Sequence, residues 1–372
     1  IFAFFIIMKK IILTFFLISV LHSFSQEESV NYLQLDYFYG NILPQNGTEH
    51  LITGHPKSLL ITWNKRSFGE KLWEQHYNYP DIGITFGYQD FKNQYLGELY
   101  AAYAHYNFYF FNRKSKNKLV LGFGIGLGYI TNPYNKITNN KNITLGTHLN
   151  SSSYLKLFYQ RENIIKNIGL QTGFTFIHAS NASFRAPNKG INTYGFNVGL
   201  NYNLNSRKQI FTNNIDIKNY KEPIHFNANL YVGFNESDYI NTGIYPFMVV
   251  SLFADKRLNR KTSLQFGAEL HLHNYLKEHI KFKYIFNGDV TRTNYPDWKR
   301  TSLFVGHELF INKISIITQL GYYLYSPAIL NETIYERIAM KTYFGKSYFA
   351  SLGIKVHLVN AESLEFGIGY RF

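Results

Sequence analysis

The sequence contains no cysteine, which excludes disulfide frameworks, thiolate metal sites and cysteine nucleophiles. Acidic residues are scarce, since 24 Asp and Glu stand against 38 Lys and Arg and leave a net charge of +14. What the chain has in excess is aromatic side chains, with 31 Tyr and 33 Phe among its 372 residues. A chain with 45% hydrophobic residues does not stay disordered, and this aromatic content is unlike that of an ordinary water-soluble enzyme.

The N-terminus has the pattern of a secretory signal peptide. Met8, Lys9 and Lys10 give a basic start, residues 11–21 form a short apolar core, and small residues follow up to Ser25. We expect residues 1–25 to be removed, with residues 1–7 preceding an initiator Met8. A transmembrane anchor is the alternative, but the apolar core is too short to span about 30 Å of hydrocarbon. Loss of the two lysines lowers the net charge from +14 to +12.

Beyond this segment, apolar and polar residues alternate in stretches of about ten residues. Residues 119–131, 224–234 and 364–372 are clear examples, and every long apolar stretch is interrupted in the same way. Such segments, separated by turn residues, are typical of transmembrane β-barrels. We therefore predict an all-β fold, a transmembrane antiparallel up-and-down barrel of about 14 strands, within a range of roughly 12 to 16. A soluble β-sandwich does not explain the signal peptide, the aromatic content and the last strand together.

No Pro-rich or Ser-rich linker divides the chain, so residues 26–372 are expected to form a single barrel. Within it, residues 31–204 and residues 222–372 form two parts, the second supplying additional strands. An eight-stranded barrel followed by a second unit from about residue 222 is the alternative. Long polar stretches predict outward loops at residues 132–142, 207–222 and 276–298.

Three polar side chains interrupt the predicted lipid-facing surface near the middle of the chain. His178 and Ser180 are in phase with the apolar residues of one strand, and Asn192 is in phase with those of the next. Polar groups facing lipid persist when they are paired or functional. A histidine beside a serine, with a third hydrogen-bonding residue, is the arrangement of an activated hydroxyl nucleophile. The alternative is an interfacial belt of polar residues that contact lipid headgroups.

The motif around these residues favours the catalytic interpretation. His178-Ala-Ser180-Asn181-Ala182, followed by Pro187-Asn188-x-Gly190, resembles the active-site motif of the lipid A 3-O-deacylase (PagL-type) family of acyloxyacyl hydrolase-like outer-membrane barrels. The resemblance implies that Ser180 is the nucleophile and His178 the general base. It also implies that the Asn181 side chain and the Ala182 backbone N–H are oxyanion donors. Residues 31–204 are the deacylase-like part.

The third member of the site departs from the family pattern. The family has a glutamate twelve residues after the serine, where this chain has Asn192, as in an enlarged bacterial branch. No Asp or Glu occurs between Glu162 and Asp216, so no nearby acid replaces it. An amide can orient an imidazole but cannot offset the charge of an imidazolium. The sequence therefore predicts a slow enzyme, or one completed by an acid from another strand.

The remaining features add partners and exclude others. Glu269, His271 and His273 share one strand face but lack a further ligand at metal-site spacing, so we predict lumen-lining residues and no metal or cofactor. The basic charge suits the phosphates of lipopolysaccharide, and nucleic acid is not expected. The terminal Phe372 resembles the signal by which the barrel-assembly machinery recognises the last strand.

The resemblance thus implies an esterase of the bacterial outer membrane. It would remove the 3-O-linked acyl chain from lipid A of lipopolysaccharide by Ser-His catalysis at a site facing the membrane lipids. The alternative is a non-catalytic outer-membrane barrel, either a pore or a relative that has lost its activity.

Overall fold

The computed structural model describes residues 30–372 except 205–209, 215–219, 221, 328–332 and 359. The expected signal peptide, residues 1–25, lies outside the described residues. Within them, no helix has both the length and the apolar character needed to cross a membrane. The helical elements are η1 (Glu49–Leu51), α2 (Leu72–His76) and α3 (Tyr275–Phe286).

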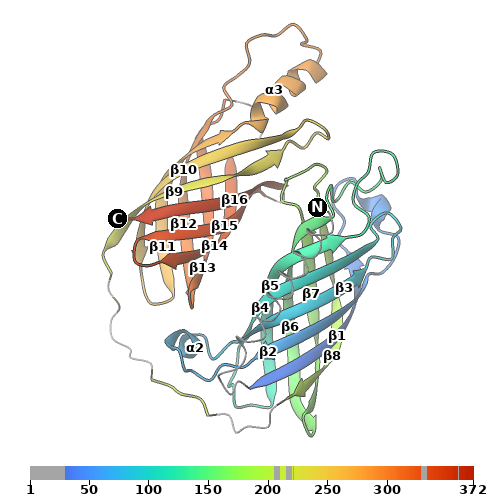
Figure 1. Ribbon diagram of the computed structural model, residues 1–372, viewed down its shortest axis with the longest axis vertical. Coiled ribbons are helices and arrows are strands. Elements are labelled where there is room, and N and C mark those ends of the chain that lie inside the picture. Colours follow the sequence, from blue (N-terminus) through green and yellow to red (C-terminus); the bar gives the residue numbers. More distant parts are fainter. Residues whose placement is uncertain (1–29, 205–209, 215–219, 221, 328–332, 359) are drawn as a thin grey trace, which may run out of the picture.

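The strands form two closed antiparallel barrels of eight strands each (Figure 1). The first comprises β1 (Asn31–Ile42), β2 (Lys57–Lys65), β3 (Asp81–Asp90), β4 (Glu98–Tyr109), β5 (Asn117–Ile130), β6 (Leu149–Ile165), β7 (Ile168–Ser180) and β8 (Ile191–Asn203). The second comprises β9 (Ile224–Glu236), β10 (Ile244–Arg257), β11 (Thr262–His273), β12 (Arg300–Ile311), β13 (Ile314–Tyr325), β14 (Ile334–Phe344), β15 (Tyr348–His357) and β16 (Asn360–Arg371).

The expected single barrel of about 14 strands is wrong. β1 pairs with β8, from Tyr32 opposite Asn203 to Ile42 opposite Thr193, and this closes the first barrel. The second barrel closes separately, where β16 pairs with β9. Alternation predicts strands and faces, but the pairing of first and last strands depends on contacts far apart in sequence. Of the two arrangements that the sequence allowed, the second unit beginning near residue 222 is the one observed.

Alternating residues of each strand face out and in, as the period of two requires. In β1, Leu33, Leu35, Tyr37 and Tyr39 are exposed on the outer wall, while Gln34 and Asp36 are buried inside. The same outer wall on β8 carries Phe196 and Val198. The apolar side chains therefore face the surroundings and the polar ones the interior, the inverse of a water-soluble domain and the pattern of a membrane barrel.

The interior of the first barrel is filled by hydrogen-bonded polar side chains. At its centre Asp36 is fully buried and lies 2.5 Å from Lys156 Nζ. The other carboxylate oxygen of Asp36 accepts hydrogen bonds from Gln171, at 2.7 Å, and from Asn197, at 3.0 Å. Paired in this way, the buried charge is stabilised by an ion pair and by amide donors.

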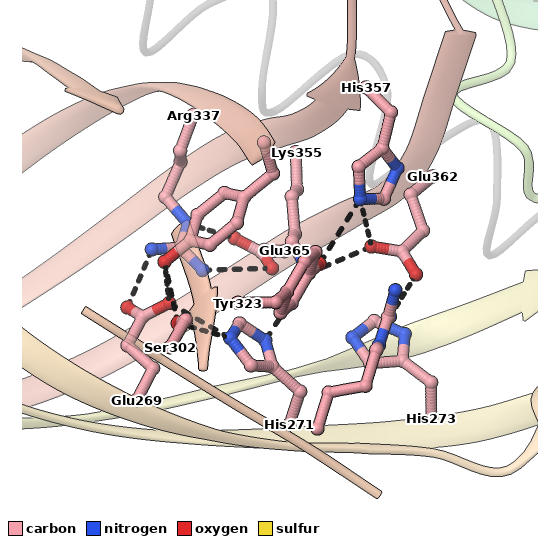
Figure 2. Close-up of polar contacts among 12 residues, drawn as sticks. Glu269, His271, His273, Ser302, Tyr323, Arg337, Lys355, His357, Glu362 and Glu365 are labelled. Atoms are coloured by element: carbon pink, nitrogen blue, oxygen red, sulfur yellow. Dashed lines mark hydrogen bonds and ion pairs between the residues drawn. The ribbon is translucent and has the colours of Figure 1, made fainter. Parts of the chain in front are cut away.

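The second barrel is filled by a larger charged network (Figure 2). Arg337 lies between two carboxylates, 2.6 Å from Glu269 and 2.5 Å from Glu365. His271 donates or accepts at Ser302 Oγ, 2.8 Å away, and its other ring nitrogen lies 3.2 Å from Lys355 Nζ. No group of three or more His, Asp or Glu side chains among the described residues could hold a metal ion. The network occupies the lumen with mutually paired charges.

The connections distinguish the two rims of the barrels. Long connections, at residues 43–56, 131–148 and 274–299, lie on the rim where β7 ends. The opposite rim carries short turns, such as 166–167 and 312–313, and one longer connection, residues 66–80, which contains α2. Long loops are typical of the extracellular side of outer-membrane barrels and short turns of the periplasmic side. The expected outward loop at residues 207–222 falls between β8 and β9 in the sequence, and residues 207–209, 215–219 and 221 of it lie outside the described residues.

The barrels also contact each other at both rims. On the short-turn rim, Tyr77 donates a hydrogen bond of 2.7 Å to the Phe310 carbonyl oxygen. On the long-loop rim, the Glu236 N–H donates to the Ser183 carbonyl oxygen at 3.0 Å. The two β-barrels therefore point the same way, and the end of β9 lies beside the connection between β7 and β8.

The ion pair at the centre of the first barrel gives a test of this interior. The variant Asp36→Asn leaves Lys156 charged and unpaired, and we expect it to lower the free energy of unfolding by about 3–5 kcal/mol. The double variant Asp36→Asn/Lys156→Met removes the orphan charge and should recover most of that loss. The heat-dependent gel shift of the folded barrel reports how much protein remains folded at each urea concentration. The urea midpoint obtained in this way measures the stability of both variants. Equal stability of the single variant and the wild type would contradict this interior.

Candidate active site

Two adjacent strands bring two of the predicted residues, His178 and Asn192, together on the outer wall. His178 on β7 lies directly opposite Asn192 on β8, and both side chains are partly exposed on the apolar face. The Nδ1 atom of His178 lies 2.6 Å from Asn192 Oδ1. With Oδ1 as acceptor, Nδ1 carries the proton, and Nε2 keeps its lone pair free to act as a base.

A tight turn follows Ser180 and directs a backbone N–H at its hydroxyl. Ala182 and Ser183 both have left-handed backbone conformations, with φ of 52° and 60°. Non-glycine residues adopt this region at an energetic cost, which the surrounding contacts must offset. In this conformation the Ala182 N–H lies 3.0 Å from Ser180 Oγ. The turn therefore places one donor at the expected nucleophile.

Asn188 completes the polar contacts of the serine. Its Nδ2 lies 3.1 Å from Ser180 Oγ, and its Oδ1 accepts the Asn181 N–H at 2.9 Å. Oδ1 is also 3.2 Å from Ser180 Oγ, so the hydroxyl can donate to it in the resting site. The pattern Pro187-Asn188-x-Gly190 contains Asn188 but by itself predicts no role for this residue. Because Asn188 contacts the Ser180 hydroxyl, it is an additional candidate residue of the active site.

Gly190 allows the loop to return close to the imidazole. Its φ is 73°, and a Cβ at this position would lie 3.2 Å from His178 Cε1 and 3.2 Å from the Ala179 carbonyl oxygen. A larger residue would therefore be strained in its backbone and would press on the histidine ring. This steric constraint explains why the motif has glycine at this position.

Not every predicted contact is formed. The hydroxyl of Ser180 binds Asn188 and the Ala182 N–H rather than the His178 ring. The Asn181 side chain donates to the Arg185 carbonyl oxygen at 2.7 Å, which keeps it within its own turn. Among the residues that the structure describes, no carboxylate forms an ion pair with His178, so Asn192 is its orienting partner.

An apolar groove lies on the outer wall of the same barrel. Adjacent strands place Ser180 opposite Ser151, Ser151 opposite Leu127, and Leu127 opposite Ala102. Neighbouring strands lie about 4.8 Å apart, so Leu127 is roughly 10 Å from Ser180 along this row. A groove of about 460 Å³ begins at Leu127 and continues over Ala102 to β2.

Two protein families match the chain, one over each barrel. Residues 57–201 match the family described as lipid A 3-O-deacylase (PagL). Residues 224–372 match the family described as acyloxyacyl hydrolase, C-terminal domain (PagL_C). No curated protein matches the chain.

Two solved structures are similar to the chain at low sequence identity. The crystal structure of the outer membrane enzyme PagL is 18% identical, with a TM-score of 0.34, and the match covers 45% of this chain and 97% of that one. The Acinetobacter baumannii outer membrane protein Omp33 is 6% identical, with a TM-score of 0.19, over 92% of this chain and 98% of that one. With one family match on each barrel, the chain belongs to the lipid A 3-O-deacylase (PagL) and acyloxyacyl hydrolase family of outer-membrane β-barrels.

Proposed function

We propose that the first barrel hydrolyses the 3-O-linked acyl ester of lipid A, with Ser180 as nucleophile and His178 as general base. The family to which the chain belongs consists of lipid A 3-O-deacylase hydrolases. The observation that supports the proposal most is the His178–Asn192 contact of 2.6 Å on the outer wall, next to Ser180. A site facing the membrane suits a substrate whose acyl chains already lie in the bilayer.

The reaction begins when the Ser180 hydroxyl turns from Asn188 to the free Nε2 of His178. His178 takes the hydroxyl proton as Oγ attacks the ester carbonyl carbon, which gives a tetrahedral oxyanion. The proton then passes from His178 to the departing 3-hydroxyl of the sugar, and the acyl group stays on Ser180. Water, deprotonated by His178, attacks the acyl-enzyme and releases the fatty acid with restoration of the serine.

Backbone and amide donors next to the serine are suited to stabilise the oxyanion. The Ala182 N–H and Asn188 Nδ2 lie 3.0 Å and 3.1 Å from Ser180 Oγ. A donor that reaches the oxyanion can contribute about 10²–10³ in rate. The Asn181 side chain, the other expected donor, would have to leave the Arg185 carbonyl oxygen to take part.

The nucleophile and base give the first test. Ser180→Ala and His178→Ala should each abolish the loss of one 3-hydroxyacyl chain from lipid A, measured by mass spectrometry of cells expressing the protein. Ser153→Ala, which alters a serine opposite His178 on β6, is the matched control and should keep the activity. If wild-type protein leaves the lipid A mass unchanged, the enzyme proposal fails and a non-catalytic barrel is favoured.

The orienting amide gives a second test. Asn192→Asp places a carboxylate at the oxygen that now lies 2.6 Å from His178 Nδ1, where it offsets the imidazolium charge. We expect kcat to rise by about tenfold or more, because the reverse change in a serine protease lowers turnover by about 10⁴. Asn192→Ala should lower kcat instead. An unchanged or lower rate for Asn192→Asp would show that another group orients the histidine.

The groove gives a third test. Ala102 lines it and is outward-facing, so Ala102→Trp should fill the path of an acyl chain without touching Ser180. We expect a clear rise in KM for lipid A and no change in the hydrolysis of a short-chain nitrophenyl ester. Gel shift on heating checks that the barrel is folded. Unaltered lipid A kinetics would exclude this groove as the acyl subsite.

A further inference from the structure

We infer that the second barrel positions the catalytic turn of the first, with Glu236 as the main positioning residue. The inference rests on the proposed function and assigns a role to the C-terminal half of the chain. Glu236 is the last residue of β9 and is buried at the junction of the two barrels, with 7% of its surface exposed. It contacts the connection between β7 and β8 in two places.

The side chain and the backbone of Glu236 both form hydrogen bonds with the turn. Its Oε2 accepts the Ala186 N–H at 2.9 Å, and its own N–H donates to the Ser183 carbonyl oxygen at 3.0 Å. The second carboxylate oxygen accepts the Gly243 N–H at 3.2 Å, which fixes the side chain to its own barrel. Both ends of the segment from Ser183 to Ala186 are therefore hydrogen-bonded to one residue of the second barrel.

A second contact comes from the start of β16. The Ser183 hydroxyl donates to the Ala361 carbonyl oxygen. The next residue, Glu362, is held by the buried network of the second barrel, through Arg300 and through Lys355 Nζ at 2.8 Å (Figure 2). The charged network thus anchors the strand end that holds the turn. The buried charges therefore help to position this strand end in addition to filling the lumen.

These contacts bear on catalysis through the backbone of the turn. Ala182 and Ser183 are in the left-handed region, which persists only where surrounding contacts over-determine it. The Ala182 N–H lies 3.0 Å from Ser180 Oγ in the same turn, so a change in the path of the turn would move this donor. Within the turn itself, the Phe184 N–H donates to the Asn181 carbonyl oxygen at 3.1 Å, and the Asn181 side chain donates to the Arg185 carbonyl oxygen at 2.7 Å. The hydrogen bonds from Glu236 and Ala361 add to these local bonds.

The test compares full-length variants of Glu236 acting on lipid A. Glu236→Ala loses both acceptors, and we expect kcat to fall by about 10- to 100-fold with KM nearly unchanged, because an oxyanion donor is displaced. Glu236→Gln keeps one acceptor and should give an intermediate rate. Glu336→Gln is the matched control, since Glu336 accepts the Leu358 N–H at 3.0 Å on the same rim of the same barrel. It should keep wild-type kinetics.

Amide hydrogen exchange provides a readout that does not depend on activity. In Glu236→Ala the amides of residues 182–186 should exchange faster, while those of β7 and β8 should be unchanged. If Glu236→Ala does not fold, Ser183→Ala removes only the hydroxyl bond to Ala361 and should show the same effects more weakly.

The outcomes separate the two proposals. Wild-type kcat together with unchanged exchange in Glu236→Ala would overturn the positioning role, even if Ser180→Ala is inactive. An inactive wild type would overturn the proposed function, and the exchange data would still decide whether the second barrel holds the turn. A rise in KM alone, with kcat and exchange unchanged, would also overturn the inference.

Discussion

Closure of the backbone in lipid is the constraint on which this structure depends. No water is available in the bilayer core, so every strand must find two partners within the chain. The chain meets this requirement twice, through β1 with β8 and through β9 with β16. An eight-stranded barrel has an interior only wide enough for side chains. A lipid substrate therefore has no route through either lumen, and the outer wall is the surface on which chemistry on lipid can occur.

The scarcity of acidic residues acquires a structural reason from the two interiors. Asp36 pairs with Lys156 in the first barrel, and Glu269 and Glu365 flank Arg337 in the second. A buried charge that loses its partner lowers the stability of the fold by several kcal/mol. These acids are therefore required where they pair with the buried cations. Among the described residues, no acid pairs with His178 on the outer wall, and its imidazole contacts the amide of Asn192 instead.

The alternation of residues predicted which side chains face lipid, and it placed His178, Ser180 and Asn192 on one wall. It could not predict how many strands close together, because a strand of one barrel and a strand of the other have the same period. The contact between Glu236 and the turn after Ser180 was equally hidden, since it joins residues far apart in sequence and leaves no periodic signal. Asn188 was visible within its motif, but its role depends on a loop that folds back, which spacing alone does not show.

A site built from amides suits its position on a lipid-facing wall. A resting His–Glu pair would place a formal charge against hydrocarbon, where an ionised group is costly unless it is paired. The neutral pair of His178 and Asn192 avoids that cost in the resting state, and under the proposed mechanism charge develops only while the ester reacts. In that mechanism the oxyanion must be stabilised by preorganised dipoles. The proposed mechanism therefore depends more on the fixed geometry of the turn after Ser180 than a site with a carboxylate would, which gives the inferred positioning by the second barrel a physical reason.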